Sequence, residues 1–232
     1  GEILSVMDGG NITALRTGAA SGLATRLFAG KEAHTMALFG CGAQGKTQIE
    51  AVLCERPVRK ILIFEKNRDR AYRFIEKLQG ETSAEIVFCE DTSALNEADI
   101  ICTATNATAP LFKREDVKKG VHINAIGSFQ PHMQELDPRL IRDARVFTDS
   151  TEPCLKESGD LIIPLREGII NKDHIAGEIG DFLLKQIKGR ESDDQITIFK
   201  SVGVAIQDYM VATDIFNCSL EEGFGIDINL SD

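Results

Sequence analysis

Neither a C-x-x-C pair nor a cluster of histidines occurs in this 232-residue sequence, although it contains six cysteines. Paired spacings are typical of structural zinc sites and of the disulfide frameworks of small secreted domains. Their absence argues against both kinds of site, so we expect no metal site and a reducing compartment. The cysteines are scattered along the chain, at Cys41, Cys54, Cys89, Cys102, Cys154 and Cys218.

Long apolar runs and an excess of positive charge are also missing. No run reaches the 18–20 or so apolar residues that span a bilayer. The 26 lysines and arginines are outnumbered by 36 aspartates and glutamates, which gives a formal net charge of −10. An acidic surface repels phosphate backbones and anionic lipids, so we expect neither nucleic acid nor membrane as a partner. The sequence begins at Gly1 without the composition of a signal or transit peptide, and a cytoplasmic location is therefore expected.

Short apolar segments alternate with amphipathic helical segments from Met36 to about Asp149. Strands that are apolar throughout are typical of a parallel sheet buried on both faces. The alternation predicts an α/β fold with a doubly wound parallel sheet. Two helices are predicted between the first three strands, from the spacing of Ile49, Val52 and Leu53 and of Ala71, Phe74, Ile75 and Leu78. The predicted strands are Met36–Phe39, Lys60–Phe64, Glu85–Phe88, Ile100–Cys102, Val121–Ile126 and Val146–Phe147.

The two ends of the chain follow a different pattern and are not expected to join the sheet. The apolar run at residues 3–7, closed by Asp8-Gly9-Gly10, predicts a strand and a turn. Thr13 is predicted to cap a helix whose apolar row is Leu15, Ala19, Leu23 and Leu27. Further helices are predicted over Asp173–Gly189 and from about Val204, with the polar run at 189–195 as a linker.

The segment Gly40-Cys41-Gly42-Ala43-Gln44-Gly45 is a G-x-G-x-x-G motif between a predicted strand and a predicted helix. Gly40 permits the tight turn, Gly42 lets the backbone approach a pyrophosphate, and Gly45 lets the helix pack close to the strand. The helix N-terminus then offers N–H groups to the phosphates, and Gln44 adds a side-chain contact. The alternative is a glycine-rich turn that binds nothing. In this context the motif predicts dinucleotide binding and a Rossmann-type sheet.

Glu65 follows Gly45 by twenty positions, at the end of the next predicted strand. A carboxylate there accepts hydrogen bonds from the ribose hydroxyls and repels a 2′-phosphate, which favours NAD. Lys66 and Arg68 come directly after it. These cations would hold a phosphate if Glu65 turned aside, so NADP remains an alternative.

Small polar residues follow the fourth and fifth predicted strands. Thr103 and Thr105 lie where the fourth strand ends, and residues 124–127 end the fifth strand. Ligands of doubly wound sheets bind at this carboxyl edge. The alternative for these segments is a plain connection between strand and loop.

Three more segments carry a family likeness, LRTGAASG at 15–22, GSFQPHMQELD at 127–137 and FKSVG at 199–203. Together with the glycine-rich turn they resemble the ornithine cyclodeaminase/mu-crystallin family over nearly the whole chain. That family includes cyclodeaminases, archaeal-type alanine dehydrogenases, and ketimine or cyclic-imine reductases. The resemblance implies a Rossmann domain at residues 31–200 and a dimerisation and substrate domain built from 1–30 and 201–232. It also implies a homodimer, and a family member that lacks about a hundred N-terminal residues.

The resemblance gives roles to three residues outside the glycine-rich turn. Arg16 is implied as a clamp for a substrate α-carboxylate, and Thr17 and Ser201 as cofactor contacts. A guanidinium among small apolar residues needs an anionic partner, and a planar carboxylate suits it. The alternative for Arg16 is an intramolecular ion pair.

Phe129 stands where cyclodeaminases of the family carry an acid/base aspartate. A phenyl ring neither gives nor takes a proton, so this position favours a reductase or dehydrogenase over a cyclodeaminase. His132 is interpreted as a loop residue, and Met133 replaces a lysine that contacts cofactor in some relatives. Glu135 and Asp137 would make a carboxylate pair, but the run to Pro138 is typical of a helix N-cap.

The sequence therefore predicts an NAD-dependent oxidoreductase that acts on a small amino acid, imine or keto acid. The alternatives are an ornithine cyclodeaminase that uses NAD, and a nucleotide-binding protein without turnover. No catalytic residue is assigned, and Arg16 is the candidate substrate contact. The candidate cofactor contacts are Thr17, Gly40, Gly42, Ala43, Gln44, Gly45, Glu65, Thr103, Thr105, Asn124, Ala125, Ile126 and Ser201.

Overall fold

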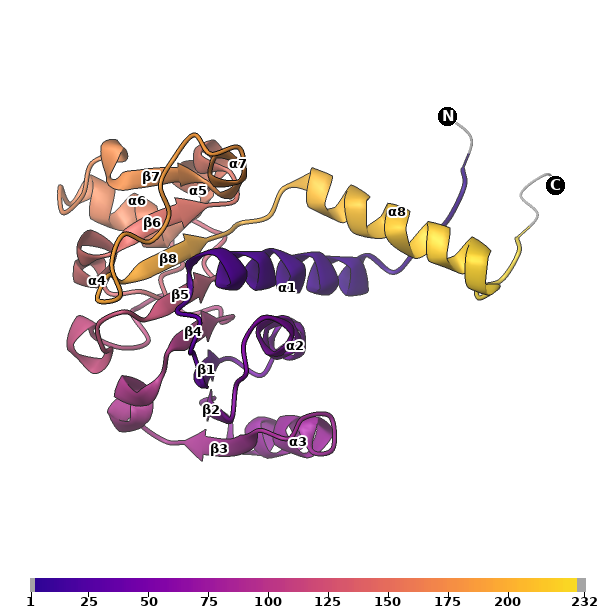
Figure 1. The fold of residues 1–232 in the computed structure, drawn as a ribbon, viewed down its shortest axis with the longest axis horizontal. Coiled ribbons are helices and arrows are strands. Elements are labelled where there is room, and N and C mark those ends of the chain that lie inside the picture. Colours follow the sequence, from indigo (N-terminus) through magenta and orange to yellow (C-terminus); the bar gives the residue numbers. More distant parts are fainter. Residues whose placement is uncertain (1–2, 229–232) are drawn as a thin grey trace.

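Eight parallel strands form one sheet with helices on both faces in the computed structural model, which describes residues 3–228 (Figure 1). The strand order is β3-β2-β1-β4-β5-β8-β6-β7, and the direction of winding reverses between β1 and β4. The strands are β1 Thr35–Phe39, β2 Lys60–Phe64, β3 Glu85–Cys89, β4 Ile100–Thr103, β5 His122–Ala125, β6 Arg145–Thr148, β7 Ile175–Glu178 and β8 Thr197–Lys200. The α-helices are α1 Gly9–Phe28, α2 Gly45–Glu55, α3 Arg68–Leu78, α4 Pro138–Asp143, α5 Thr151–Glu157, α6 Gly159–Arg166, α7 Ile179–Leu183 and α8 Ala205–Glu222.

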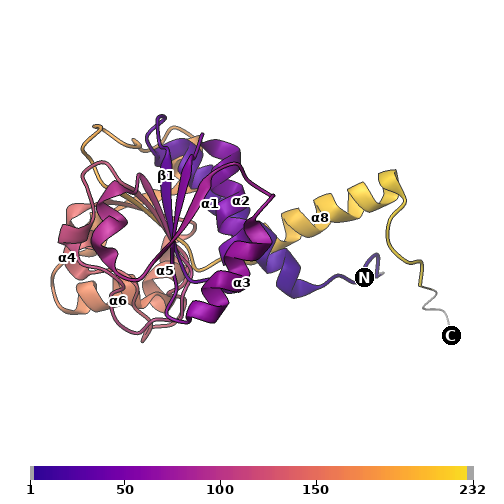
Figure 2. The same cartoon turned by 90° about the horizontal axis from the view of Figure 1, so that it is seen from below.

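The predicted doubly wound parallel sheet is confirmed, and all six predicted strands are present. Alternate residues of each strand point to opposite faces, which divides the core into two layers. Met36 and Leu38 of β1 pack under α2 and α3, whereas Ala37 and Phe39 pack on the face covered by α4 and α6. Figure 2 shows these two helical layers on either side of the sheet.

Two strands were not predicted. The segment predicted as a helix over Asp173–Gly189 contains β7, the short helix α7 and a loop. Gly177 has φ of +138°, which a helix cannot contain, so the helical spacing of the isoleucines there was misleading. The prediction that this segment stays outside the sheet was also wrong, because β7 is an edge strand beside β6. The second strand that was not predicted, β8, lies between β5 and β6. This strand begins with Thr197 and ends with Lys200, and both residues are fully buried. It was not predicted because a central strand with polar residues at both ends lacks the continuous apolar pattern.

The N-terminal segment also differs from its prediction. Residues 3–7 form no strand, and Ile3, Leu4 and Val6 are exposed. The helix begins at Gly9 rather than after Thr13, because the Asp8 carboxylate accepts a 2.7 Å hydrogen bond from the Asn11 N–H and caps it.

Helix α1 buries small and polar residues instead of the predicted apolar row. Leu15 is 46% exposed, and the buried face consists of Ala14, Thr17, Gly18, Ser21, Gly22, Ala24, Thr25 and Phe28. A Cβ atom on Gly18 would lie 2.8 Å from the Thr47 carbonyl oxygen, and one on Gly22 would lie 3.2 Å from the Ala51 side chain. The two glycines thus let α1 approach α2 closely, which a row of leucines would prevent.

A polar network at His122 joins α1 to the centre of the sheet. The imidazole is fully buried, with Nδ1 2.9 Å from Thr197 Oγ1 and Nε2 3.1 Å from Asn124 Oδ1. The Asn124 amide in turn donates to Thr25 Oγ1 at 3.0 Å. Burial, with the charge of Arg190 as a smaller cause, lowers the pKa of His122 to about 3. The folded protein therefore holds this ring neutral.

We expect His122 to make the fold sensitive to mild acid. The pKa of a histidine in the unfolded chain is about 6.5, so as the pH falls below this value the unfolded state takes up a proton that the folded state refuses. The contribution of His122 to the free energy of unfolding is fully present above pH 6.5. Below this value the free energy of unfolding falls by up to about 1.4 kcal/mol per pH unit, which amounts to about 2 kcal/mol at pH 5. Urea unfolding between pH 7 and pH 5 measures this slope. His122→Gln should flatten it, whereas His132→Gln, on an exposed loop, should not; equal slopes in all three proteins would refute the assignment.

Candidate functional site

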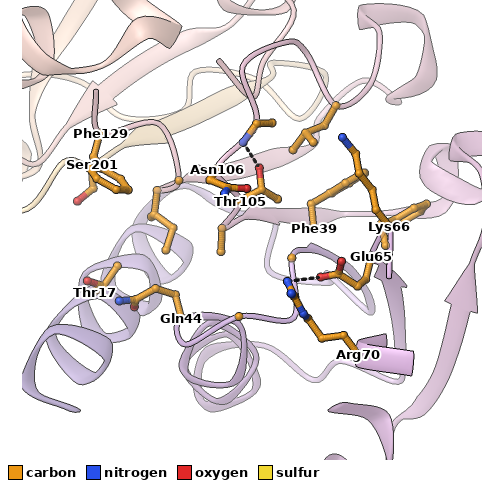
Figure 3. A pocket seen from close by; sticks show the side chains of 18 of the residues that line it. Thr17, Phe39, Gln44, Glu65, Lys66, Arg70, Thr105, Asn106, Phe129 and Ser201 are labelled. Atoms are coloured by element: carbon orange, nitrogen blue, oxygen red, sulfur yellow. Dashed lines mark hydrogen bonds and ion pairs between the residues drawn. The ribbon is translucent and has the colours of Figure 1, made fainter. Parts of the chain in front are cut away.

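A pocket of about 730 Å³ opens at the carboxyl ends of β1, β2, β4, β5 and β8, where the winding reverses (Figure 3). We name its two ends by the strands that supply them. The β2–β3 end is lined by Phe64, Glu65, Lys66, Arg70, Cys89, Glu90, Asp91 and Thr92. The β4–β8 end is lined by Thr13, Arg16, Thr17, Ala104, Thr105, Asn106, Ala107, Leu111, Ile126, Gly127, Phe129, Ser201 and Val202.

The glycine-rich turn forms the floor between these two ends. Gly40 has φ of +98°, and a Cβ atom there would lie 2.6 Å from the Ala104 carbonyl oxygen. A Cβ atom on Gly45 would lie 2.7 Å from the Gly40 carbonyl oxygen. Gly42 lines the pocket with no described atom within 4 Å of its Cβ position, so the space above it is free for a ligand. Ala43 is exposed beside this turn but does not line the pocket.

Gln44 and Thr17 face each other across the floor (Figure 3). Thr17 donates its hydroxyl hydrogen to the Thr13 carbonyl at 2.7 Å. The Gln44 Oε1 atom is buried and has no hydrogen-bond partner among the described residues. A polar side chain left unsatisfied in a pocket fits a bound polar ligand.

Glu65 lies at the β2–β3 end, as predicted. Its carboxylate accepts hydrogen bonds from the backbone N–H of Cys41 at 3.1 Å and of Asn67 at 3.0 Å, so it also fixes the glycine-rich turn against β2. Arg70 lies 3.8 Å from this carboxylate and lines the pocket together with Lys66.

Arg68 does not line the pocket, contrary to its predicted place beside Lys66. It is ion-paired with Glu90 at the surface. Arg70 was not predicted to line the pocket, and the helical turn of α3 brings it back toward the strand end.

The predicted contacts on β4 and β5 divide into two groups. Thr105 and Ile126 line the pocket, whereas Thr103, Asn124 and Ala125 lie beneath it and are fully buried. Position at a strand end was the only basis for these last three predictions. On β4 and β5, the residues just beyond the strand ends are the ones that reach the pocket.

Arg16 lines the pocket from α1 and also contacts α8. Its Nε atom lies 3.2 Å from Asp208 Oδ1, and its Nη1 atom lies 3.3 Å from Gln207 Oε1. The guanidinium packs against Gly203, where a Cβ atom would clash with it. The intramolecular ion pair that was the alternative for Arg16 is therefore present. The same side chain also lines the pocket.

Phe129 and Ser201 both line the β4–β8 end (Figure 3). The Phe129 ring is 50% exposed, whereas Ser201 is nearly buried and donates a 2.6 Å hydrogen bond to Asp149 Oδ2. The same Asp149 oxygen accepts a 2.8 Å bond from the Gly203 N–H, so one carboxylate holds the whole connection from β8 to α8. His132 is exposed and Met133 is buried, and neither lines the pocket.

The charged side chains that line the pocket are unevenly distributed. Carboxylates and cations crowd the β2–β3 end. Among the described residues that line the β4–β8 end, Arg16 is the one charged side chain, and no histidine, cysteine or carboxylate accompanies it. That end can therefore bind an anion, but it offers no general acid or base.

Residues 3–228 contain neither a candidate metal site nor a membrane-spanning helix. No group of three or more histidine, cysteine or acidic side chains is arranged to hold a metal ion in that range. No helix in that range is long and apolar enough to cross a membrane.

Comparison with known proteins gives consistent matches along nearly the whole chain. The sequence profile of the ornithine cyclodeaminase/mu-crystallin family matches residues 1–223. Delta(1)-pyrroline-2-carboxylate reductase of Bacillus cereus is 41% identical over 227 residues, which cover 97% of this chain and 70% of that protein. Alanine dehydrogenase of Archaeoglobus fulgidus is 34% identical over 223 residues, which cover 96% of this chain and 68% of that protein.

A solved structure is similar as well. Delta(1)-pyrroline-2-carboxylate reductase of Thermococcus litoralis, in complex with NADH and L-proline, matches with a TM-score of 0.92 at 38% identity. The match covers 96% of this chain and 69% of that chain.

The glycine-rich turn gives a prediction for stability. Gly45→Ala places a methyl group 2.7 Å from the Gly40 carbonyl oxygen, so we expect a loss of about 1–3 kcal/mol from overpacking. Gly42→Ala meets open space and should change stability by less than about 0.5 kcal/mol. Chemical denaturation of the two variants measures the difference, and equal losses would contradict the assigned roles.

Proposed function

Since the chain belongs to the ornithine cyclodeaminase/mu-crystallin family, we propose that it is an NAD(H)-dependent oxidoreductase that reduces a small imine carboxylate. The observation that carries this proposal is the β4–β8 end of the pocket, which combines one anion-binding side chain with no acid or base. An amino-acid dehydrogenase of the alanine type is the second candidate, supported by the similarity to the Archaeoglobus fulgidus enzyme.

The pocket suits a nicotinamide dinucleotide in size and in the order of its groups. The space above Gly42 would take the pyrophosphate, and the amino-terminal end of α2 would face it. Glu65 would accept hydrogen bonds from the ribose hydroxyls and would repel a 2′-phosphate. This supports NAD over NADP, although Lys66 and Arg70 also line the pocket. The Thermococcus litoralis structure contains NADH, which supports the same choice. When bound, the reduced dinucleotide supplies the hydride.

The substrate class follows from the chemistry that the β4–β8 end lacks. Reduction of a preformed imine needs one hydride at the carbon and one proton, from water, at the nitrogen. Making that imine from a keto acid and ammonia needs several proton transfers to and from oxygen and nitrogen, which general acid–base groups assist. Phe129 and its neighbours cannot provide them, whereas Arg16 can hold a carboxylate. The ring of Phe129 also offers an apolar surface to a compact cyclic substrate.

We also propose the division of the chain that its family resemblance implied, with residues 31–200 as the cofactor domain and 1–30 and 201–232 as parts of a dimerisation and substrate domain. The described part of α8 runs away from the sheet beside α1 (Figure 1). It exposes Ile206, Tyr209 and Met210, which fits a helix that another subunit or domain covers. A homodimer is the proposed assembly.

Kinetics of the full-length protein test the proposed reaction. With NADH, kcat/KM for Δ1-pyrroline-2-carboxylate should be at least tenfold higher than kcat/KM for pyruvate with ammonia. The decrease in NADH absorbance measures both rates. Gly42→Val is the matched control, since its side chain fills the pyrophosphate position and should abolish NADH binding while the protein stays folded. Preferential use of pyruvate would support the dehydrogenase instead. Conversion of ornithine to proline and ammonia without net NADH change would support a cyclodeaminase, and NADH binding without turnover would support a binding protein.

Arg16→Leu should lower kcat/KM for the imine strongly. Two charge-assisted hydrogen bonds to a partly desolvated carboxylate are worth roughly 2–5 kcal/mol when one side is removed, which corresponds to a loss of about 30- to several-thousand-fold. NADH affinity should change little, because the dinucleotide is held elsewhere. Steady-state kinetics and a separate NADH titration measure both quantities.

Asp208→Asn separates the clamp from the ion pair. If Arg16 acts only by binding α8, this substitution should reduce activity as much as Arg16→Leu. If Arg16 binds substrate, Asp208→Asn should keep activity within about threefold, because the Asp208 side chain is 37% exposed and an ion pair in contact with water contributes little. An Arg16→Leu variant with activity within threefold of the parent would refute the clamp.

A further inference from the structure

Glu135 is a fully buried carboxylate directly behind the β4–β8 end of the pocket. Its Oε1 atom accepts hydrogen bonds from the backbone N–H and the hydroxyl of Thr105, both at 2.7 Å. Its Oε2 atom accepts from the Thr103 hydroxyl and the Gly127 N–H, both at 2.8 Å. One side chain thus joins the ends of β4 and β5 and holds the two segments that line the pocket there.

Two other buried charges accompany Glu135. Lys200 Nζ lies 3.4 Å from Asp160 Oδ2 and donates to the Ala125 carbonyl at 2.9 Å. Asp160 Oδ1 accepts the backbone N–H groups of Glu135 at 2.7 Å and Leu136 at 3.0 Å. Since Lys200 balances Asp160, the group of three carries one uncompensated negative charge, on Glu135.

The protonation of Glu135 reflects opposing effects. Burial, followed by the negative charge of Asp160, raises the pKa of Glu135 above its ordinary value, and the charge of Lys200 and the hydroxyls of Thr105 and Thr103 offset part of this rise. Four donors converge on the two oxygens, and two of them are backbone N–H groups that can only donate. Hydrogen bonds of this kind stabilise the charged form against the effect of burial, and we take Glu135 as ionised on the strength of these four donors.

A single layer of backbone separates this charge from the pocket. A Cβ atom on Gly127 would lie 2.4 Å from Glu135 Oε1 and 2.3 Å from the Thr105 carbonyl oxygen. Both Gly127 and Thr105 line the pocket. The low polarizability of a buried site leaves such a charge poorly screened, so a ligand at that end experiences it.

We propose that Glu135 is a positioning residue whose fixed charge favours the oxidised, cationic nicotinamide over the neutral reduced form at the β4–β8 end. The inference rests on the proposed function, because that function puts the nicotinamide there. The positive charge of the ring appears as the hydride leaves, and an oriented charge that requires no reorganisation stabilises it as it develops. Glu135 would therefore assist hydride donation to the imine without touching substrate or cofactor.

The test is the ratio of the dissociation constants of NAD+ and NADH, measured by titration of the full-length protein and its variants. Glu135→Gln keeps the shape and removes the charge, so the affinity for NAD+ should fall about tenfold more than that for NADH, and kcat for imine reduction should fall as well. Glu135→Asp keeps the charge but shortens the side chain, and should weaken both nucleotides alike. Thr103→Val removes one hydrogen bond to Glu135 without a change of charge and should also leave the ratio unchanged.

An unchanged ratio in a folded Glu135→Gln protein would overturn the inference and leave the proposed function intact. Failure of the parent protein to bind either nucleotide would instead refute the proposed function. Should Glu135→Gln not fold, the unmodified protein gives the answer. It should bind NAD+ at least tenfold more tightly than NADH, from which it differs at this end by the positive charge of the ring, and equal affinities would overturn the inference.

Discussion

Carboxylates buried beneath the carboxyl edge of the sheet hold the loops that form the pocket. Glu135 fixes the segments after β4 and β5, Asp160 fixes the segment that carries Glu135, and Asp149 fixes the connection from β8 to α8. Each accepts at least one backbone N–H, and hydrogen bonds to a charged group are worth about 1.5–3 kcal/mol apiece. The loops are thus ordered by polar contacts from below, which leaves their upper surface free for ligands.

The strands and the dinucleotide motif were predictable because each depends on local pattern. Buried parallel strands are apolar throughout, and the three glycines of the turn have separate steric causes that the structure shows at Gly40 and Gly45. The same reasoning failed where a neighbour distant in sequence decides the outcome. β8 is buried because β5 and β6 enclose it, and α1 buries glycines because α2 lies against them. Neither neighbour can be seen in the local sequence.

The candidate site likewise contains residues that local sequence pattern predicted and residues that it did not. Gly40, Gly42 and Gln44 of the turn line the pocket as predicted, whereas Ala43 and Gly45 do not. Thr17, Glu65, Thr105, Ile126 and Ser201 also line it as their positions predicted. Arg70 was missed because its place depends on the phase of α3 relative to the strand end. Glu135 was interpreted with the N-cap of α4, and Asp137 does cap that helix. The role of Glu135 depends on donors about 30 residues earlier in the chain, which no spacing rule reveals.

The place of β8 in the sheet also constrains how the chain can be assembled during synthesis. β6 and β7 pair with each other, but β8 alone joins them to β5. Until Thr197–Lys200 has left the ribosome, the five strands from β3 to β5 end in an open edge, and the β6–β7 pair has no parallel partner beside it. Open edges of this kind attract other chains. The nascent protein therefore completes its sheet only when its last strand emerges.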